Sequence, residues 1–401
     1  MIFYRVTKMN VKKILNKALI AIDAIFHGWK FKPNTNSNGK KIVIVFQQLL
    51  GDAIAITDSL NEYTKIFPKN QGYQVKFLAR PLVIAFMKDV CIIPNDLIFE
   101  ELDFKKLIEN FAYYKAVSKK YRNNIDVLIV PVTTPSAEIF SCSSNAPRKI
   151  ASVRPVDIKN SLLMSALSKF AYTEKIRPLK SEMTLQRHRQ LINYLANNND
   201  FKARLPKLKS QPKIIRENHY CVVCAGASKP ERWWQAEKFS EIINFLNENY
   251  KLNVHLCGGT DEAKIENSLR VKHPEMLFSH IGKTNFSEWS SIVQHADLVV
   301  ANDSATAHLA AAHNVKTVCI IGDYEFVMFP YKVDILEQNQ RLPECIFKRF
   351  PCENCRDIGY YTGSGNPDCK NRINNNQCAL CIDAITVDDV KNSIIKIMKE
   401  G

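Results

Sequence analysis

Two stretches of this chain alternate short apolar runs with amphipathic helical patterns, and this alternation constrains the fold more than any other feature. In the first stretch, β-rich runs at 42–46, 74–78 and 127–130 are separated by helical patterns. Strands buried on both faces read as short continuous apolar runs, as they do in parallel sheets that are covered by helices. The alternation therefore predicts a doubly wound α/β domain, a Rossmann-like unit, over residues 40–175.

The same alternation restarts in the second half of the chain and predicts another Rossmann-like domain over residues 216–340. Its strand-like runs are 219–225, 254–257, 297–301 and 318–321. Between the two domains, residues 176–215 hold a helical segment and a Lys/Pro-rich stretch, which we interpret as a linker. Because parallel sheets bind ligands at the carboxyl ends of their strands, two such domains predict a ligand cleft between them.

Residues 1–39 precede the first domain as a basic N-terminal arm. Residues 1–41 hold nine basic residues and a single acidic residue, Asp23, in a chain whose formal net charge is +15. An apolar helical face flanked by lysines suits the headgroup layer of an acidic membrane, whereas the alternative is that this face packs on the body of the protein. The apolar residues that recur at helical spacing are Val11, Ile14, Leu15, Ala18, Leu19, Ile22, Ile25, Phe26 and Trp29.

Several protein classes are excluded by what the chain lacks. No stretch of 18 uncharged apolar residues occurs, and Lys17 and Asp23 interrupt the N-terminal apolar segment without a small-residue cleavage site after it. We therefore expect a cytoplasmic chain with no transmembrane helix. No Gly-x-Gly-x-x-Gly, P-loop or Asp-x-Asp motif occurs, so a phosphate would be held by helix N-termini and basic side chains.

Polar residues follow the predicted strands of the second domain. Arg232 lies before a helical pattern, next to two tryptophans, and Asp303, Ser304 and His308 lie between a strand and a helix. Hydroxyls and backbone N–H groups at such a turn can cradle a diphosphate. The alternatives are that Asp303 and Ser304 only cap the helix, and that Arg232 is a surface arginine stacked on a tryptophan.

In the first domain, Gly51 and Asp52 lie where a helix starts after the first strand. A carboxylate at this position can accept the proton of a hydroxyl group, and such assistance accelerates a reaction by roughly 10²–10⁴-fold. The alternative is a first-turn aspartate that only stabilises the helix N-terminus.

Taken in order, these motifs resemble the signature of the ADP-heptose:lipopolysaccharide heptosyltransferase family over residues 40 to 395. Each motif alone is weak, but their order and spacing make the resemblance specific. The motifs are Gly51-Asp52, Gly226-Ala-Ser228 with Arg232-Trp233, Gly258-Gly259 with Glu262, Ile281-Gly-Lys-Thr284, and Asn302-Asp-Ser with His308-Leu-Ala-Ala-Ala312.

The resemblance implies a GT-B fold, with two Rossmann-like domains facing each other across a cleft, and an inverting, metal-independent glycosyltransferase. In that family the aspartate of the Gly-Asp pair is the general base, which corresponds to Asp52. Arg232 stands where the family often has Lys, and Ala305 replaces the usual Gly. The residues that the resemblance assigns to the donor site are Gly226, Ser228, Lys229, Arg232, Glu262, Asp303, Ser304, Ala305 and His308.

The resemblance also implies the partners. They are ADP-heptose as donor, a lipopolysaccharide inner-core or related surface-glycan acceptor, and the cytoplasmic face of the inner membrane, with no nucleic acid. One alternative is a basic nucleic-acid-binding protein with a four-cysteine zinc module. Against it, the apolar stripe of the arm is aliphatic and no RNA-reading aromatic motif occurs. Another alternative is a catalytically inactive relative.

Residues 341–401 form a Cys-rich segment followed by a helical pattern. Cys352, Cys355, Cys378 and Cys381 have the paired spacing of a structural zinc site. Free or redox-active thiols are the main alternative, because disulfides are disfavoured in a reducing cytosol. The chemistry that the resemblance implies requires no cofactor.

Overall fold

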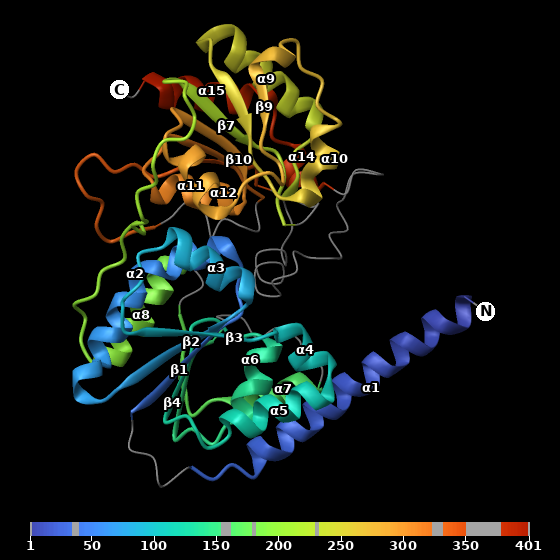
Figure 1. Ribbon diagram of the computed structural model, residues 1–401, viewed down its shortest axis with the longest axis vertical. Coiled ribbons are helices and arrows are strands. Elements are labelled where there is room, and N and C mark those ends of the chain that lie inside the picture. Colours follow the sequence, from blue (N-terminus) through green and yellow to red (C-terminus); the bar gives the residue numbers. More distant parts are fainter. Residues whose placement is uncertain are drawn as a thin grey trace.

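The computed structural model describes residues 2–33, 40–153, 162–178, 182–228, 232–322, 332–349 and 378–399. These residues form two α/β domains, one above the other in Figure 1, each built on a six-stranded sheet. All the strand pairs within both sheets are parallel. The fold class predicted from the alternating pattern is therefore confirmed.

The first domain has the strand order β3-β2-β1-β4-β5-β6. Its central strand β1 is buried along almost its whole length, which explains why its sequence is a continuous run of Ile, Val and Phe. Its strands are β1 (Lys41–Phe46), β2 (Gln74–Ala79), β3 (Leu97–Glu101), β4 (Val127–Val130), β5 (Arg148–Ser152) and β6 (Glu174–Ile176). Its helices are α2 (Leu50–Ile66), α3 (Pro81–Val90), α4 (Phe104–Glu109), α5 (Phe111–Tyr121), α6 (Pro135–Cys142) and α7 (Leu162–Ala171).

The second domain has the strand order β12-β11-β10-β7-β8-β9, which is the same topology in the opposite reading direction. Its strands are β7 (Tyr220–Cys224), β8 (Asn253–Leu256), β9 (Leu277–Ser279), β10 (Leu298–Asn302), β11 (Thr317–Ile320) and β12 (Glu344–Ile346). Its helices are α9 (Ala236–Tyr250), α10 (Ala263–Glu266), α11 (Phe286–Gln294), α12 (Ala305–Ala312), α14 (Leu380–Asp383) and α15 (Val387–Lys399).

This topology determines where a ligand can bind. In the first sheet the strand order reverses between β1 and β4, and in the second sheet it reverses between β7 and β10. The loops that leave neighbouring strands at such a point diverge to opposite faces and leave a crevice at the carboxyl ends of the strands. Asp52 follows β1 and Asp303 follows β10, so both residues lie at these switch points.

The two domains are in direct contact through helices. Helix α2 packs on α12, and α3 packs on α11. At the second contact the Phe86 ring lies 5.4 Å from the ring of Phe286 and 5.9 Å from that of Trp289, measured between ring centroids. One hydrophobic core therefore runs from the first sheet into the second.

Two segments outside the predicted domain ranges complete these layers. Helix α8 (Thr184–Ala196) lies within the predicted linker 176–215 and packs against α2 of the first domain. After residue 340, β12 extends the second sheet, and α15 packs against α9 and β11.

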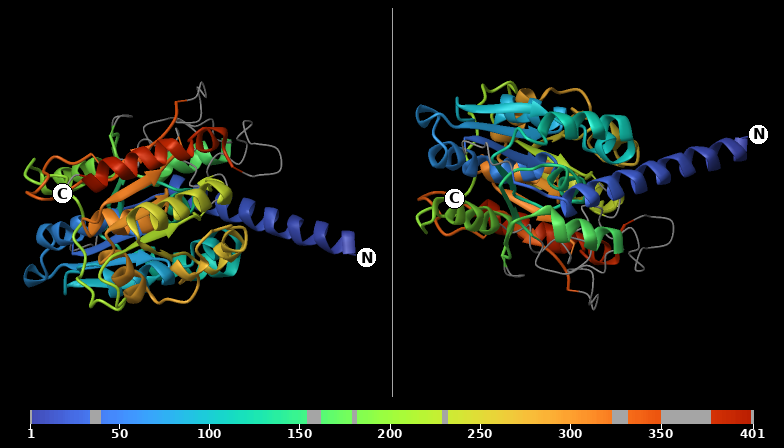
Figure 2. Two further views of the ribbon diagram at one scale, coloured as in Figure 1. Left: turned by 90° about the horizontal axis from the view of Figure 1, so that it is seen from above. Right: turned by 90° about the horizontal axis from the view of Figure 1, so that it is seen from below.

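Helix α1 (Ile2–Trp29) projects from the body of the protein with its N-terminus free of the domains (Figures 1 and 2). Ile20, Ala21 and Ala24 are buried in the core of the first domain. The apolar stripe expected to face either a membrane or the protein body lies largely on the opposite side and is exposed. Its exposed members are Ile14, Leu15, Leu19, Ile22, Phe26 and Trp29.

No helix in the described part of the chain combines the length and the apolar character needed to cross a lipid bilayer.

Candidate active site

A pocket with a volume of about 830 Å³ lies between the two domains. Its walls include residues from the loops after β1, β4, β7 and β10, which are the loops at the two switch points. The volume is in the range of small-molecule and cofactor sites. The ligand cleft that the sequence predicts between the domains is therefore present in the structure.

Asp52 lines this pocket from the first turn of α2. Burial raises the pKa of its carboxyl to about 6. The positive charge of Arg232 opposes this rise, and the negative charge of Asp303 reinforces it. A residue of the first domain is thus in electrostatic contact with two residues of the second domain. With a pKa of about 6, the carboxyl is mostly ionised at pH 7 and can still accept a proton.

Arg232, Asp303 and His308 form a polar cluster in the second-domain part of the pocket, next to the helix end that carries Asp52. Arg232 Nη1 lies 3.2 Å from Asp303 Oδ2, and His308 Nε2 lies 3.8 Å from Asp303 Oδ1. Burial lowers the pKa of His308 to about 4, and Arg232 lowers it further while Asp303 opposes the change. The imidazole is therefore neutral at pH 7. The pairing of Arg232 with a buried carboxylate favours its interpretation as a pocket residue over that of a surface arginine.

The first turn of α12 also lines the pocket, through Ser304, Ala305 and Thr306. Ser304 occupies the N-cap position, but its side chain makes no capping hydrogen bond. Its hydroxyl instead donates to Cys224 Sγ over 3.5 Å. The interpretation of Ser304 as a side-chain helix cap is therefore wrong, and its hydroxyl is positioned at a helix N-terminus, where anions bind favourably.

Glu262 occupies the end of the pocket under the β7 and β8 loops. It belongs to the short 3₁₀ turn Thr260–Glu262, and its carboxyl lies so close to Gly226 and Gly258 that a Cβ at either glycine would overlap it. Burial raises the pKa of Glu262 to about 7. Its Oε2 atom is buried without a hydrogen-bond partner among the described residues, and buried polar atoms are nearly always paired in native proteins.

Some of the remaining predicted site residues are described by the structure, and others are not. Ser228 is exposed and lines the pocket next to Ala227. Lys229, Cys352 and Cys355 lie outside the described residues. Cys378 and Cys381 are described and are buried in the core of the second domain. In the part of the chain that the structure describes, no group of three or more His, Cys, Asp or Glu side chains is arranged to hold a metal ion.

The structure adds pocket residues of the first domain that the sequence analysis missed. Arg80 follows β2 and donates from Nε to the carbonyl of Gln47 over 3.0 Å, and Gln47 Oε1 accepts hydrogen bonds from Thr134 and Ser136. The position of Arg80 at the end of a predicted strand was a usable signal. Arg187 and His188 lie on α8, where polar residues of an amphipathic helix give no such signal.

Asn302 forms hydrogen bonds that hold the loop carrying Arg232. Its Oδ1 accepts from the backbone N–H of Trp234 over 3.3 Å, and its Nδ2 donates to the carbonyl of Ala225 over 2.6 Å. The end of β10 is thereby tied to both sides of the loop that carries Arg232.

Comparisons with known proteins agree with this arrangement. Residues 161–353 match the family Glycosyltransferase family 9 (heptosyltransferase). A region of 124 residues is 28% identical to lipopolysaccharide heptosyltransferase 3 of Escherichia coli K12 and covers 30% of this chain and 36% of that relative. Lipooligosaccharide heptosyltransferase 2 of Haemophilus influenzae is 27% identical over 124 residues, covering 29% of this chain and 35% of the relative. The matched region thus spans little more than a third of either relative.

Solved structures match over nearly the whole chain. A family 9 glycosyl transferase from Veillonella parvula has a TM-score of 0.65 at 14% identity, covering 92% of this chain and 99% of its own. The Escherichia coli heptosyltransferase WaaC with ADP has a TM-score of 0.57 at 14% identity, covering 90% and 98%. The iron-containing dodecameric glycosyltransferase TibC of enterotoxigenic Escherichia coli has a TM-score of 0.53 at 14% identity, covering 92% and 77%. The two facing Rossmann-like domains are those of the GT-B fold. The match to the glycosyltransferase family 9 model covers just under half of the chain.

Proposed function

We propose that this chain is an inverting glycosyltransferase that transfers heptose from ADP-heptose to a lipopolysaccharide inner-core precursor or a related surface glycan. The observation that carries the proposal is the position of Asp52, which lines the same pocket as Arg232, Asp303 and His308 of the second domain and interacts electrostatically with Arg232 and Asp303. The choice of sugar and acceptor rests on the names of the relatives, which are lipopolysaccharide and lipooligosaccharide heptosyltransferases.

In this reaction Asp52 acts as the general base. Its carboxylate accepts the proton of the attacking acceptor hydroxyl, and the hydroxyl oxygen forms a bond to the anomeric carbon of the donor sugar. The bond from that carbon to the diphosphate oxygen breaks, and its electron pair leaves with ADP. Because attack and departure occur on opposite faces of the sugar, the anomeric configuration is inverted.

The second domain stabilises the leaving diphosphate. Arg232 supplies a positive charge, and the first turn of α12 presents a helix N-terminus and the Ser304 hydroxyl to the same pocket. Preorganised donors of this kind stabilise charge that develops in the transition state. We therefore propose that transfer is independent of metal ions. Glu262, with its unpaired buried oxygen, is suited to accept a hydrogen bond from a hydroxyl of the nucleotide.

The proposal places the enzyme in the cytoplasm, on the inner-membrane surface, with α1 as its contact. Lys30 and Lys32 are exposed and follow the apolar stripe, and Lys30 Nζ lies 4.3 Å from the centre of the Phe26 ring. Lys13 and Lys17 instead lie 3.5 and 3.4 Å from the Glu109 carboxylate of α4. An apolar stripe with lysines fits an interface between acyl chains and anionic headgroups.

For the C-terminal cysteines we propose a structural zinc site formed by Cys352, Cys355, Cys378 and Cys381. The proposal rests on their paired spacing. Elemental analysis of the purified protein for zinc, and for iron because TibC is described as iron-containing, tests it. Less than one metal equivalent in protein purified without chelators contradicts the proposal.

The central experiment is a thermal-shift screen with ADP-, GDP-, UDP- and CMP-sugars, followed by a transfer assay with and without EDTA. A ligand that binds only the folded protein raises the Tm, and a concentration of 100 times Kd contributes about 2.7 kcal/mol. We expect ADP-heptose to raise the Tm most and EDTA to leave the transfer rate unchanged. Binding to nucleic acid without any response to nucleotide sugars would instead favour the nucleic-acid-binding alternative.

A further inference from the structure

One face of helix α8 lines the pocket on the side of the first domain. Thr184, Arg187 and His188 are its pocket-lining residues, and their spacing of three and four places them on one face of the helix. Helix α8 packs against α2, which carries Asp52. This wall therefore belongs to the domain of the proposed base, whereas the Arg232 cluster belongs to the second domain.

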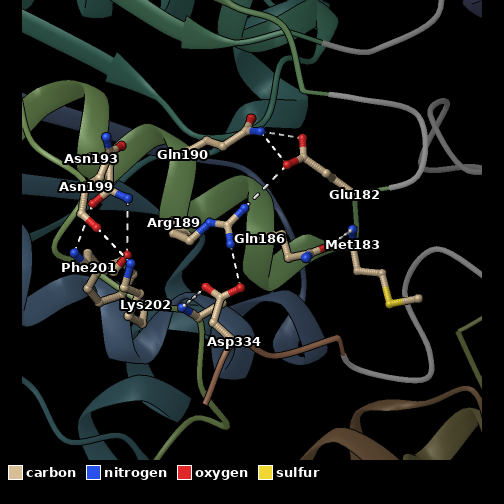
Figure 3. A network of polar contacts seen from close by, with 11 residues as sticks. Glu182, Met183, Gln186, Arg189, Gln190, Asn193, Asn199, Phe201, Lys202 and Asp334 are labelled. Atoms are coloured by element: carbon tan, nitrogen blue, oxygen red, sulfur yellow. Dashed lines mark hydrogen bonds and ion pairs between the residues drawn. The ribbon is translucent and has the colours of Figure 1, made fainter.

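The opposite face of α8 is anchored by a network of polar contacts, which Figure 3 shows from close by. Arg189 forms ion pairs with Glu182 and with Asp334, and Asn193 exchanges two hydrogen bonds with the backbone of Phe201. Contacts on this face fix the rotation of the helix about its axis. The side chains of the pocket face are therefore held in position before any ligand binds.

His188 is the unusual member of this pocket face. Its side chain is 3% exposed, and neither ring nitrogen has a hydrogen-bond partner in the described part of the chain. Buried polar groups in native proteins are nearly always paired, and leaving one unpaired is costly. A histidine in this state beside a pocket indicates that its partner comes from a ligand.

The charge state of His188 indicates the kind of ligand. Burial lowers the pKa of His188 to about 4, and the positive charge of Arg187 lowers it further. The ring is neutral at pH 7, so it offers one N–H donor and one acceptor nitrogen. A neutral ring of this kind matches a hydroxyl group, which can donate and accept, better than it matches an anion. Gln48 Oε1, also buried and unpaired among the described residues, lines the same pocket.

We propose that His188 is an acceptor-binding residue that forms a hydrogen bond with a hydroxyl group of the acceptor saccharide. This inference rests on the proposed transferase function and adds a residue that selects and orients the acceptor. The acceptor, and not the donor, is the expected partner because His188 lies on the wall that carries Asp52.

The test compares His188→Phe with the wild type. Phenylalanine keeps an aromatic ring of similar size but removes both nitrogens. Binding of a heptose-free inner-core oligosaccharide to the ADP-loaded protein is measured by calorimetry, and acceptor KM by the transfer assay. We expect the variant to raise the acceptor Kd and KM roughly tenfold or more, with the Kd for ADP unchanged and the Tm equal to or above that of the wild type.

Two further variants sharpen the result. His188→Gln retains a donor and an acceptor and should recover part of the acceptor affinity. Tyr194→Phe is the matched control, because Tyr194 lies on α8 outside the pocket and its hydroxyl bonds Glu174; it should leave acceptor affinity unchanged.

The outcomes separate this inference from the proposed function. An unchanged acceptor Kd in His188→Phe overturns the inference, as does a parallel loss of Tm, ADP binding and acceptor binding, which indicates a purely structural role. Acceptor binding that depends on His188 in a protein that transfers no sugar contradicts the proposed function and leaves the inference standing. A wild-type protein that does not bind the oligosaccharide overturns the inference.

Discussion

At the residue scale, the proposed chemistry depends on the surroundings of Asp52. An ordinary aspartate is a weak base near neutral pH, and burial in the pocket raises the pKa of Asp52 to about 6. A base is most effective when its pKa lies near the working pH. The Arg232 charge opposes the rise, so the carboxyl remains ionised at pH 7.

Asp52→Asn removes the base and keeps the shape of the side chain. We expect the transfer rate to fall by roughly 10²–10⁴-fold, with the Kd for ADP nearly unchanged, as measured by initial rates and calorimetry. The wild-type kcat/KM should fall as the pH drops through about 6, because protonation removes the base. Asp58→Asn is the matched control, since Asp58 lies on the same helix but does not line the pocket.

The same pKa has a consequence for stability. The pKa of Asp52 in the folded protein lies above the ordinary aspartate value of 3.8, so the unfolded chain binds fewer protons than the folded one between about pH 4 and pH 6. The contribution of Asp52 to stability is therefore lost as the pH rises through this range. Asp52→Asn should raise the Tm at pH 7, and a Tm below the wild-type value would show that the carboxylate has a structural role.

At the scale of elements, α1 has two apolar faces with different partners. Ile20 is fully buried against the first domain, whereas its neighbour Leu19 is 51% exposed on the other face. The sequence analysis left open whether the apolar stripe contacts a membrane or the protein body. The structure shows that Ile20, Ala21 and Ala24, together with Ile25 from the stripe, pack on the body, whereas most of the stripe is exposed.

Replacing exposed stripe residues should affect membranes and not folding. We expect Leu15→Ser, Leu19→Ser and Ile22→Ser, combined, to lower binding to phosphatidylglycerol vesicles at least tenfold, because each buried Leu or Ile contributes roughly 1.5–3 kcal/mol. The Tm should not change. Co-sedimentation with vesicles and thermal denaturation measure the two effects.

Ile20→Ser is the contrasting control, since it places a hydroxyl in the core of the first domain. It should destabilise the protein by several kcal/mol, as other large-to-small core changes do. Unchanged vesicle binding in the triple variant would contradict the proposed role of α1.

Elements with continuous apolar runs were predictable, and short edge strands were not. The central strands β1, β4, β7 and β10 lie at or within a residue or two of the predicted runs. The edge strands β3, β6, β9 and β12 were missed, because they are only three to five residues long and largely exposed or half-buried. The interior strand β5 was also missed, because it begins with two basic residues and so lacks a continuous apolar run. A strand of this kind carries too few buried positions to show a pattern, and neighbouring strands decide whether it forms.

At the scale of the whole molecule, the active site depends on the approach of α2 to α12. A Cβ at Gly51 would lie 2.7 Å from His308 Cδ2, closer than side-chain carbons approach in proteins. Gly51 thus permits the first domain to bring Asp52 against the cluster of the second domain. The glycine of the Gly-Asp pair therefore allows the two domains to come into close contact. The sequence pattern alone did not reveal this role.

Gly51→Ala should push the two helices apart. We expect a lower Tm and a transfer rate reduced at least tenfold, while the Kd for ADP changes little, because the second-domain wall of the pocket is unaffected. Gly259→Ala is the matched control for stability, since a Cβ there meets no atom within 4 Å. A Gly51→Ala protein with wild-type Tm and activity would show that the close approach of α2 to α12 is not needed for stability or for transfer.

The sequence by itself determined the two α/β domains, because buried parallel strands require apolar runs and such runs are visible without a structure. It also predicted the residues that follow those strands, including Asp52 and Asp303, since loops at strand ends carry ligand sites, whereas Glu262 was predicted only from the family resemblance. Only the tertiary structure decided that Arg232 pairs with Asp303, that His188 reaches the pocket unpaired, and that the stripe of α1 is exposed. Each of these three features depends on contacts between segments that are far apart in the chain. The local sequence does not indicate which distant groups will come into contact.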